Sequence, residues 1–113
     1  MLHRLPIALA AAGLALAALA PAAFAQTVTG NADAAKNKVS MCTGCHGIPG
    51  YHTAYPEVYH VPKIGGQQAG YIISALKEYK SGARWHPSMR GIAASLTEQD
   101  MADLAAHYSG VAK

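Results

Sequence analysis

The sequence is 113 residues long and weakly basic, with nine Lys and Arg residues against six Asp and Glu and a formal net charge of +3. It contains no run of basic residues and no basic stretch interleaved with aromatic side chains, so it has none of the sequence features of a nucleic-acid-binding protein. A chain of this length can form one small domain and no more.

Residues 1–25 are predicted to be a secretory signal peptide. A positive start at Arg4 precedes a run of mostly Ala and Leu over residues 5–20, and residues 23–25 supply the small residues typical of a cleavage site. The apolar run is shorter than the roughly 20 residues that a membrane-spanning helix needs. We therefore expect a single mature domain over residues 26–113 in the periplasm, with no stable membrane insertion after cleavage. A retained membrane anchor is the alternative.

The first part of the expected domain, residues 31–44, is rich in Ala and Lys and has neither Pro nor an interior Gly. Ala35, Val39 and Cys42 follow one another at the spacing of one helical face. This pattern predicts one continuous helix that brings Cys42 and Cys45 onto the same side.

The segment from Cys42 to His46 reads Cys-Thr-Gly-Cys-His and is the most specific pattern in the chain. Two thiols three positions apart, followed at once by an imidazole, are typical of a covalent attachment site for c-type haem. On one helical turn each sulfur can bond to a vinyl group of the porphyrin, and His46 then lies under the iron as its proximal ligand. We therefore expect one haem c, with its iron, bound through Cys42, Cys45 and His46.

Three other interpretations of these cysteines have weaker support in the sequence: a redox-active Cys-x-x-Cys pair, a structural disulfide and half of a zinc site. A closed zinc site needs four nitrogen or sulfur ligands, and no second Cys or His pair with the required spacing occurs. A thioredoxin-like pair needs a strand nearby, and no alternating or β-branched segment follows Cys45.

Residues 47–61 contain Pro49, Gly50, Pro56 and three Tyr residues. This composition predicts a long loop without regular secondary structure, and ordered loops of this length usually have a function. The loop can shield the haem or form a surface for a dedicated partner, and the spacing does not decide between these roles.

Two further helices are predicted. The first spans residues 67–81, with apolar side chains on one face, and Gly82 ends it. The second spans residues 97–110, where Thr97 and Asp100 have the spacing of a capping box.

Met89 is the candidate for the second axial ligand of the iron. It lies in a segment without a helical cap or periodicity, which predicts a loop able to carry a side chain across the haem. Met41 adjoins Cys42 on the proximal side, and Met101 lies on the apolar face of the last helix, which predicts a core residue. His86 is the strongest competitor of Met89. All four histidines after the attachment motif, His86 included, are expected at the surface or in packing roles: His52, His60, His86 and His107.

Several segments occur in the order and spacing of a known family. They are residues 42–47, 62–67 and 79–84, Met89 with Ala93 and Leu96, and residues 96–108. On these segments the chain resembles class I cytochrome c of the small bacterial periplasmic type over residues 32–109. The resemblance implies an all-α fold with three to four helices around one covalently attached haem, in which the first and last helices cross.

The resemblance also implies roles for single residues. It implies thioether bonds from Cys42 and Cys45, and axial ligation of the iron by His46 and Met89. It further implies that the Pro62 carbonyl accepts a hydrogen bond from the other ring nitrogen of His46 and so fixes its tautomer.

These features predict a one-electron carrier without enzymatic activity, monomeric, which contacts a donor and an acceptor redox protein transiently in a respiratory or dehydrogenase pathway. One alternative is a haem subunit held tightly by a periplasmic dehydrogenase. Another is a sensor that binds a small ligand at the haem, which requires that Met89 does not ligate the iron. Because the domain is small, we also expect the haem-free chain to be largely unfolded.

Overall fold

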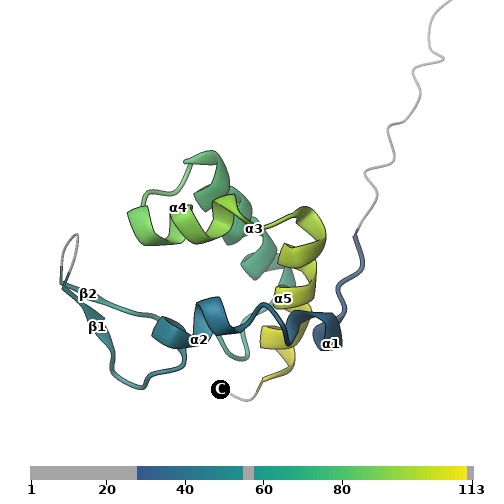
Figure 1. Cartoon of the computed structure of the whole chain (residues 1–113), viewed down its shortest axis with the longest axis horizontal. Helices are drawn as coiled ribbons and strands as arrows, with labels where there is room; N and C mark the ends of the chain where they lie inside the picture. Colours follow the sequence, from purple (N-terminus) through teal and green to yellow (C-terminus); the bar gives the residue numbers. More distant parts are fainter. Residues whose placement is uncertain (1–27, 55–57, 112–113) are drawn as a thin grey trace, which may run out of the picture.

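The computed structural model describes residues 28–54 and 58–111 (Figure 1). The predicted signal peptide lies outside these residues. The described part forms five helical segments and one short hairpin: α1 (Ala32–Ala35), α2 (Ser40–His46), β1 (His52–Thr53), β2 (Tyr59–His60), α3 (Ala69–Ser81), α4 (Pro87–Ala94) and α5 (Glu98–Gly110). No helix within the described residues is long and apolar enough to span a membrane.

The segment predicted as one helix over residues 31–44 is divided into α1 and α2. α1 begins after Asn31, whose side-chain oxygen accepts hydrogen bonds from the N–H groups of Asp33 and Ala34. Residues 36–39 then form turns, in which hydrogen bonds to the third preceding residue interrupt the helical ladder. The expectation of one continuous helix was therefore wrong. The change of direction lets α1 pack on α5 while α2 leads towards the hairpin (Figure 1).

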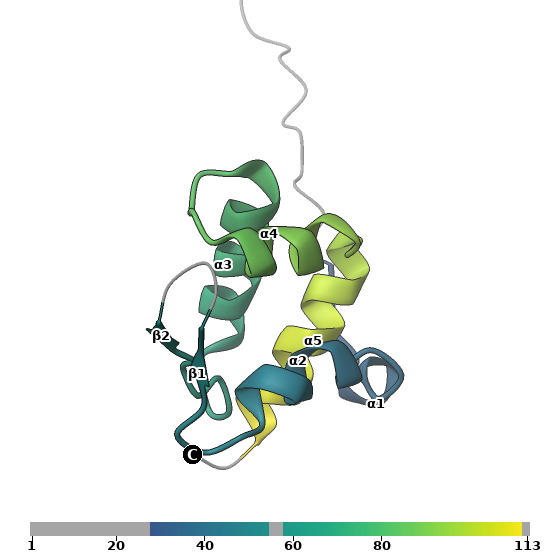
Figure 2. The same ribbon diagram turned by 60° about the vertical axis from the view of Figure 1, so that its left-hand side comes forward.

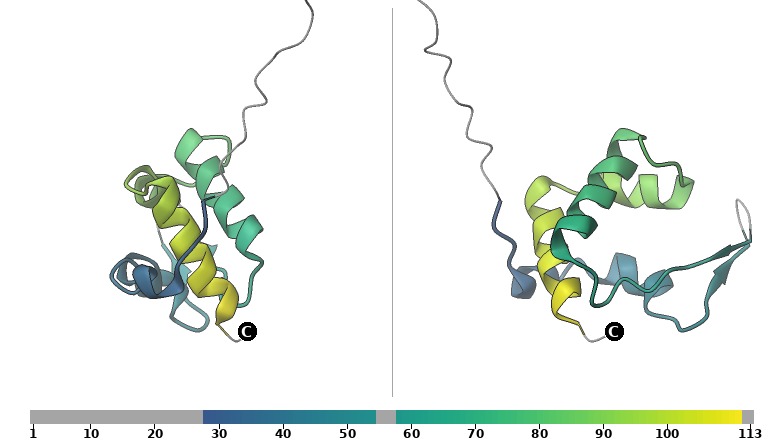
Figure 3. Two further views of the ribbon diagram at one scale, coloured as in Figure 1. Left: turned by 90° about the vertical axis from the view of Figure 1, so that its right-hand side faces the viewer. Right: turned by 180° about the vertical axis from the view of Figure 1, so that it is seen from behind.

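Residues 47–61 contain a hairpin, so the expectation of a loop without regular structure was wrong here. β1 and β2 pair antiparallel, with His52 opposite His60 and Thr53 opposite Tyr59. Strands of two residues are too short to produce a detectable alternation of side chains, which is why the sequence did not reveal them. The hairpin projects from the helical part on the side away from α5 (Figures 1 and 3).

α3 and α5 confirm the other two predicted helices. α3 begins at Ala69, slightly later than expected, and ends before Gly82, whose φ of +86° suits glycine. At the start of α5 the Thr97 side chain accepts a hydrogen bond from the Asp100 N–H, and the Asp100 carboxylate accepts one from the Thr97 N–H at 2.8 Å. This reciprocal pair is the predicted capping box.

α4 replaces the loop that was expected around Met89. Pro87 occupies the first turn, where its missing N–H costs nothing and its fixed φ suits a helix. His86 is the N-cap, and its ring Nδ1 accepts a hydrogen bond from the Met89 N–H at 3.3 Å. Histidine is not among the residues that usually cap helices, so the segment lacked the common sequence signal.

α5 is the central helix of the core. It packs against α1 and α3, and α3 packs against α4 (Figure 2). Ala35 of α1 is fully buried, and Met101 and Leu104 of α5 are each 1 % exposed. The predicted contact between the first and last helices and the core role of Met101 are therefore confirmed.

Gly30 marks the closest approach of the early chain to α5. A Cβ added there would lie 2.1 Å from the Ala102 carbonyl oxygen, a backbone atom of α5 that cannot yield without moving the helix. We expect Gly30→Ala to lower the free energy of unfolding by about 1–3 kcal/mol, the usual cost of overpacking. Urea unfolding of the variant and the parent protein measures this loss.

Gly70→Ala is the matched control, because a Cβ added at Gly70 in α3 meets no atom of the described residues within 4 Å. This variant should keep the parent's stability or gain up to about 1 kcal/mol from the higher helix propensity of Ala. Equal stability of Gly30→Ala and Gly70→Ala would contradict the close approach at Gly30.

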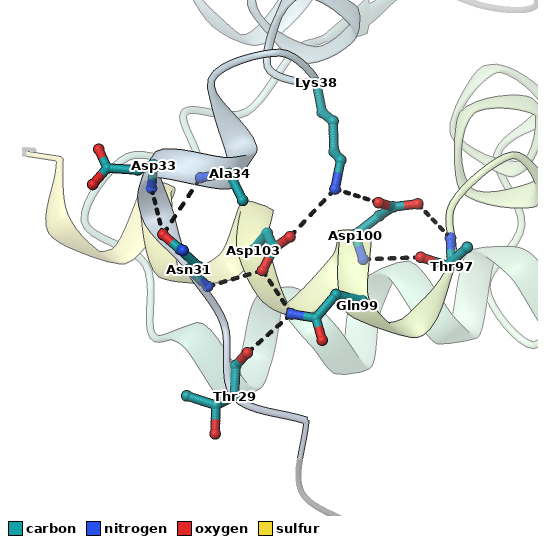
Figure 4. Close-up of polar contacts among 9 residues, drawn as sticks. All are labelled: Thr29, Asn31, Asp33, Ala34, Lys38, Thr97, Gln99, Asp100 and Asp103. Atoms are coloured by element: carbon teal, nitrogen blue, oxygen red, sulfur yellow. Dashed lines mark hydrogen bonds and ion pairs between the residues drawn. The ribbon is translucent and has the colours of Figure 1, made fainter.

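A polar cluster joins the start of the described chain to α5 (Figure 4). At its centre is Asp103, which is 2 % exposed and accepts hydrogen bonds from the Asn31 N–H and the Gln99 side chain, both at 2.8 Å. Lys38 Nζ lies 3.3 Å from the Asp103 carboxylate and also pairs with Asp100. Each of these partners of Asp103 is a donor or a cation, so the buried charge is compensated.

This cluster predicts a loss of stability at acidic pH. The Lys38 ammonium and, after it, hydrogen bonds with Thr97 lower the pKa of Asp100 from its usual 3.8 to about 2. The hydrogen bonds from Asn31 and Gln99 lower the pKa of Asp103. Because the folded state binds these protons less readily than the unfolded state, the stabilisation is complete above about pH 4 and is lost as the pH falls towards 2. We expect Asp103→Asn to unfold at lower urea concentration at pH 7, with a difference from the parent that shrinks towards pH 2.

Asp33→Asn is the control for this titration. Asp33 pairs with Lys36 at 2.8 Å, but the two side chains are 83 % and 70 % exposed. Exposed ion pairs contribute little to stability, so the urea midpoint of this variant should stay close to that of the parent at each pH. A pH-independent difference for Asp103→Asn would contradict the role given to its charge.

Candidate functional site

Four helices, α2 to α5, and the hairpin line a cavity of about 680 Å³. It lies between α2 and α4, which Figures 1 and 2 show on opposite sides of the fold. Volumes of roughly 300–1,000 Å³ are typical of small-molecule and cofactor sites. All of the predicted site residues line this one cavity: Cys42, Cys45, His46, Pro62 and Met89.

α2 brings two thiols to the wall of the cavity. Cys42 and Cys45 are one helical turn apart, and both are free thiols. Cys42 is half-buried and packs against the core, whereas Cys45 is exposed. Burial raises the pKa of the Cys42 thiol. The two sulfurs therefore lie on one side of the cavity, in the arrangement that attachment to two neighbouring groups of one cofactor requires.

His46 ends α2, and its ring orientation is fixed from outside the helix. Its Nδ1 lies 2.6 Å from the carbonyl oxygen of Pro62. A carbonyl only accepts hydrogen bonds, so Nδ1 carries the hydrogen and Nε2 is left as the nitrogen able to bind a metal. The structure thus contains the hydrogen bond that the resemblance implied, while metal ligation by His46 stays a proposal.

α4 brings Met89 to the opposite side of the cavity. Met89 is partly buried and packs against the hydrophobic core. Its N–H donates to Nδ1 of His86, so the His86 ring caps the helix that carries Met89. The sequence analysis expected His86 to be a surface or packing residue, or a competing ligand, and missed this positioning role. The Pro that follows it, which is typical of a first helical turn, was the available signal.

A second wall, formed by α3 and the segment after it, was not visible in the sequence. The Arg84 guanidinium carbon lies 5.7 Å from the ring centroid of Tyr71 and 5.3 Å from that of Tyr79, within the range of cation–π contacts. The same guanidinium donates to the Tyr71 hydroxyl at 3.3 Å and lies 3.4 Å from the Glu78 carboxylate. These contacts hold a positive charge in place at the cavity wall.

The hairpin covers another side of the cavity. Thr53, Tyr59 and Val61 line it. Tyr59 also packs edge to face against the ring of His86, with the two centroids 5.5 Å apart. These contacts support the shielding role among the two that the sequence left open for residues 47–61.

The cavity wall has the chemistry that a haem requires. Apolar side chains such as Ile64, Ile72 and Leu104 contribute to the lining and suit a large apolar ring. The Tyr108 hydroxyl is buried at this wall and makes no hydrogen bond within the described residues. Burial, with the Cys42 thiol nearby, raises the pKa of Tyr108 to about 12. A buried hydroxyl without a partner beside an attachment cysteine is expected where a bound group completes the wall.

Comparison with known proteins agrees with this geometry. The family model for cytochrome c matches residues 30–109. Cytochrome c-554(548) of Halomonas halodenitrificans is 37 % identical over 83 residues, which cover 71 % of this chain and 95 % of that protein.

Two longer proteins are also similar. Cytochrome c4 of Pseudomonas aeruginosa is 34 % identical over 80 residues, which cover 71 % of this chain but 38 % of that protein. A protein of Stutzerimonas stutzeri named thiosulfate dehydrogenase electron acceptor is 37 % identical over 65 residues, or 58 % of this chain and 29 % of that protein. The chain therefore matches only about a third of the length of these two relatives. The family match over residues 30–109 and the nearly full-length match to the Halomonas protein show that this chain belongs to the cytochrome c family of electron-transfer proteins, which bind haem c covalently.

Proposed function

We propose that the protein is a periplasmic one-electron carrier in which His46 and Met89 would ligate the haem iron. The observation that carries this proposal is the meeting of both side chains at one cavity, from α2 and α4, together with the two attachment thiols. When bound, the haem supplies a one-electron change at its iron. The role needs no enzymatic activity of the chain, because the donor and the acceptor are other redox proteins.

The residues around the axial side chains keep them in place. The Pro62 carbonyl holds the ring of His46 through the 2.6 Å hydrogen bond, and His86 caps the helix of Met89. Hydrogen bonds of this kind orient a ligand before it binds and are part of the design of a metal site. Fixed axial side chains support an electron carrier because little has to rearrange when an electron arrives or leaves.

Aromatic side chains at the solvent edge of the cavity support transient contact with partners. Tyr59, Tyr71 and Trp85 line the cavity and are 54 %, 51 % and 72 % exposed. Aromatic residues are enriched in protein interfaces, and transient redox contacts bury less than about 1,200 Å² in total. We infer that this rim is where redox proteins contact the carrier.

A haem subunit held by a periplasmic dehydrogenase is the second candidate, and the same exposed rim favours it. The name of the Stutzerimonas relative also connects that protein with a dehydrogenase. Size-exclusion chromatography of a native periplasmic extract, followed by haem absorbance, separates the candidates. Elution as a small single domain supports the carrier, and elution with a dehydrogenase supports the subunit.

Absorption spectra of the matured protein test the ligand assignment. The oxidised protein should show a weak near-infrared band from a sulfur-to-iron transition, and the reduced protein should not respond to carbon monoxide. Rapid binding of carbon monoxide to the parent protein would mean an open sixth position and would favour a sensor of small ligands.

A further inference from the structure

We propose that His52 and His60 together bind a divalent late transition-metal ion, such as Cu²⁺ or Zn²⁺, on the outer face of the hairpin. The two histidines are direct cross-strand partners in the β1–β2 register. Their ring centroids are 4.7 Å apart, with the ring planes inclined by 53°. Neither residue lines the haem cavity, so the proposed electron carrier makes no use of this pair.

The position of the pair in the ladder brings the imidazoles close together. In the same register the Val61 N–H donates to the Tyr51 carbonyl at 2.9 Å, so the pair formed by these two residues is a hydrogen-bonded one. Hydrogen-bonded and non-hydrogen-bonded pairs alternate along an antiparallel ladder, so the adjacent pair of His52 and His60 is non-hydrogen-bonded. In such pairs the Cα atoms are only about 4.5 Å apart and the side chains are closest.

Side chains alternate between the two faces of the hairpin, which places His52 and His60 on the face away from the cavity. Thr53, Tyr59 and Val61 line the cavity from the inner face of the hairpin. Successive side chains of a strand point to opposite faces, so His52 and His60 belong to the outer face. Both are exposed, which leaves an ion free access from solvent.

The chemistry of the pair selects the kind of ion. Neutral imidazole suits Zn²⁺, Cu²⁺ and Ni²⁺, and among these Cu²⁺ binds most tightly to a given nitrogen site. Two nitrogens bound to one Zn²⁺ at about 2.0–2.1 Å each lie roughly 3.3 Å apart, which rings with nearby centroids can reach by side-chain rotation. Two protein ligands leave further coordination positions to water, so we expect a reversible site. An ion held there links β1 to β2, whose inner face covers the haem.

Calorimetric titration of the tag-free holoprotein with ZnCl₂ tests the proposal. Zn²⁺ is the probe because it has no redox chemistry and does not change the oxidation state of the haem. We expect one Zn²⁺ ion to bind per protein. His52→Asn and His60→Asn should each lower the Zn²⁺ affinity by about tenfold or more, because even mutation of a residue that only supports a metal ligand has an effect of this size. Saturating Zn²⁺ should also slow hydrogen exchange of the Val61 N–H, which bonds across the two strands.

Two comparisons decide whether the histidines act as one site. The double variant His52→Asn/His60→Asn should bind Zn²⁺ no more weakly than the single variant with the lower Zn²⁺ affinity. Removal of either ligand already destroys the chelate, so the second replacement has no further effect. His107→Asn is the control; His107 lies on α5, where its ring packs on Tyr108, and its replacement should leave Zn²⁺ affinity unchanged. Unchanged haem spectra show that each variant is folded. Parent-like affinity in both single variants, or an equal loss in His107→Asn, would overturn the proposal.

Discussion

Replacing Met89 with Ala should allow the reduced protein to bind carbon monoxide stoichiometrically, whereas the reduced parent protein should not bind it. The variant should also lose the near-infrared sulfur-to-iron band and have a lower reduction potential. Opposite a histidine, a thioether sulfur raises the potential, and an Ala side chain offers no ligand in its place. Spectra with and without carbon monoxide, together with a potentiometric titration, measure all of these changes.

Met41→Ala is the matched control, because Met41 also lines the cavity but lies on α2 beside the attachment cysteine. This variant should keep the band and stay inert to carbon monoxide. His86→Asn tests the competing ligand, and Asn can still cap α4. If Met89→Ala stays inert while His86→Asn opens the site, the assignment of the sixth ligand to Met89 is wrong.

Removing the two attachment thiols should unfold the protein. We expect Cys42→Ala/Cys45→Ala to lose most of its far-ultraviolet helical signal and its cooperative melt. Without the haem, the apolar side chains that line the cavity of about 680 Å³ lose the large ring against which they would pack. Typical domains have only about 5–15 kcal/mol of stability in total. The remaining core, built mainly on α5, is too small to maintain such a cavity.

Circular dichroism of the double variant and of Thr43→Ala gives the comparison. Thr43 lies between the two cysteines, and among the described residues its side chain bonds only to the Ser40 carbonyl, so its replacement keeps both thiols. Thr43→Ala should therefore attach haem and melt cooperatively. A haem-free double variant with the parent's helix content and a cooperative melt would contradict the prediction.

The parts of the fold that follow from local patterns could be predicted from the sequence. α3 has a repeating apolar face and a glycine in the left-handed region at its end, and α5 has a two-sided capping box. α4 was not predicted because its N-cap is His86, which is not a common capping residue. β1 and β2 were not predicted because each strand has only two residues. The break between α1 and α2 coincides with Lys38. The residues with which Lys38 forms ion pairs lie in α5, far from it along the sequence. Such tertiary contacts leave no trace in local spacing.

The candidate site divides in the same way. Cys42, Cys45 and His46 could be proposed from the sequence because the attachment chemistry requires a fixed local spacing. Met89 could be proposed because few other methionines remained, and its ligand role stays a proposal. The other residues that line the cavity could not be predicted from the sequence. A residue such as Arg84 is held at the cavity wall by contacts that no short motif encodes. The hydrogen bond from His46 to Pro62 was implied by family resemblance alone.

The cluster around Asp103 also has a consequence for the order of events in biogenesis. Its hydrogen bond to Asn31 joins residues 72 positions apart, and its bond to Lys38 joins residues 65 positions apart. Contacts so remote in sequence carry a loop-closure cost and form only once the last helix is available. In the periplasmic carrier proposed above, we expect Cys42 and Cys45 to emerge from the membrane before α5. We further expect docking of α5 to be the last step of folding.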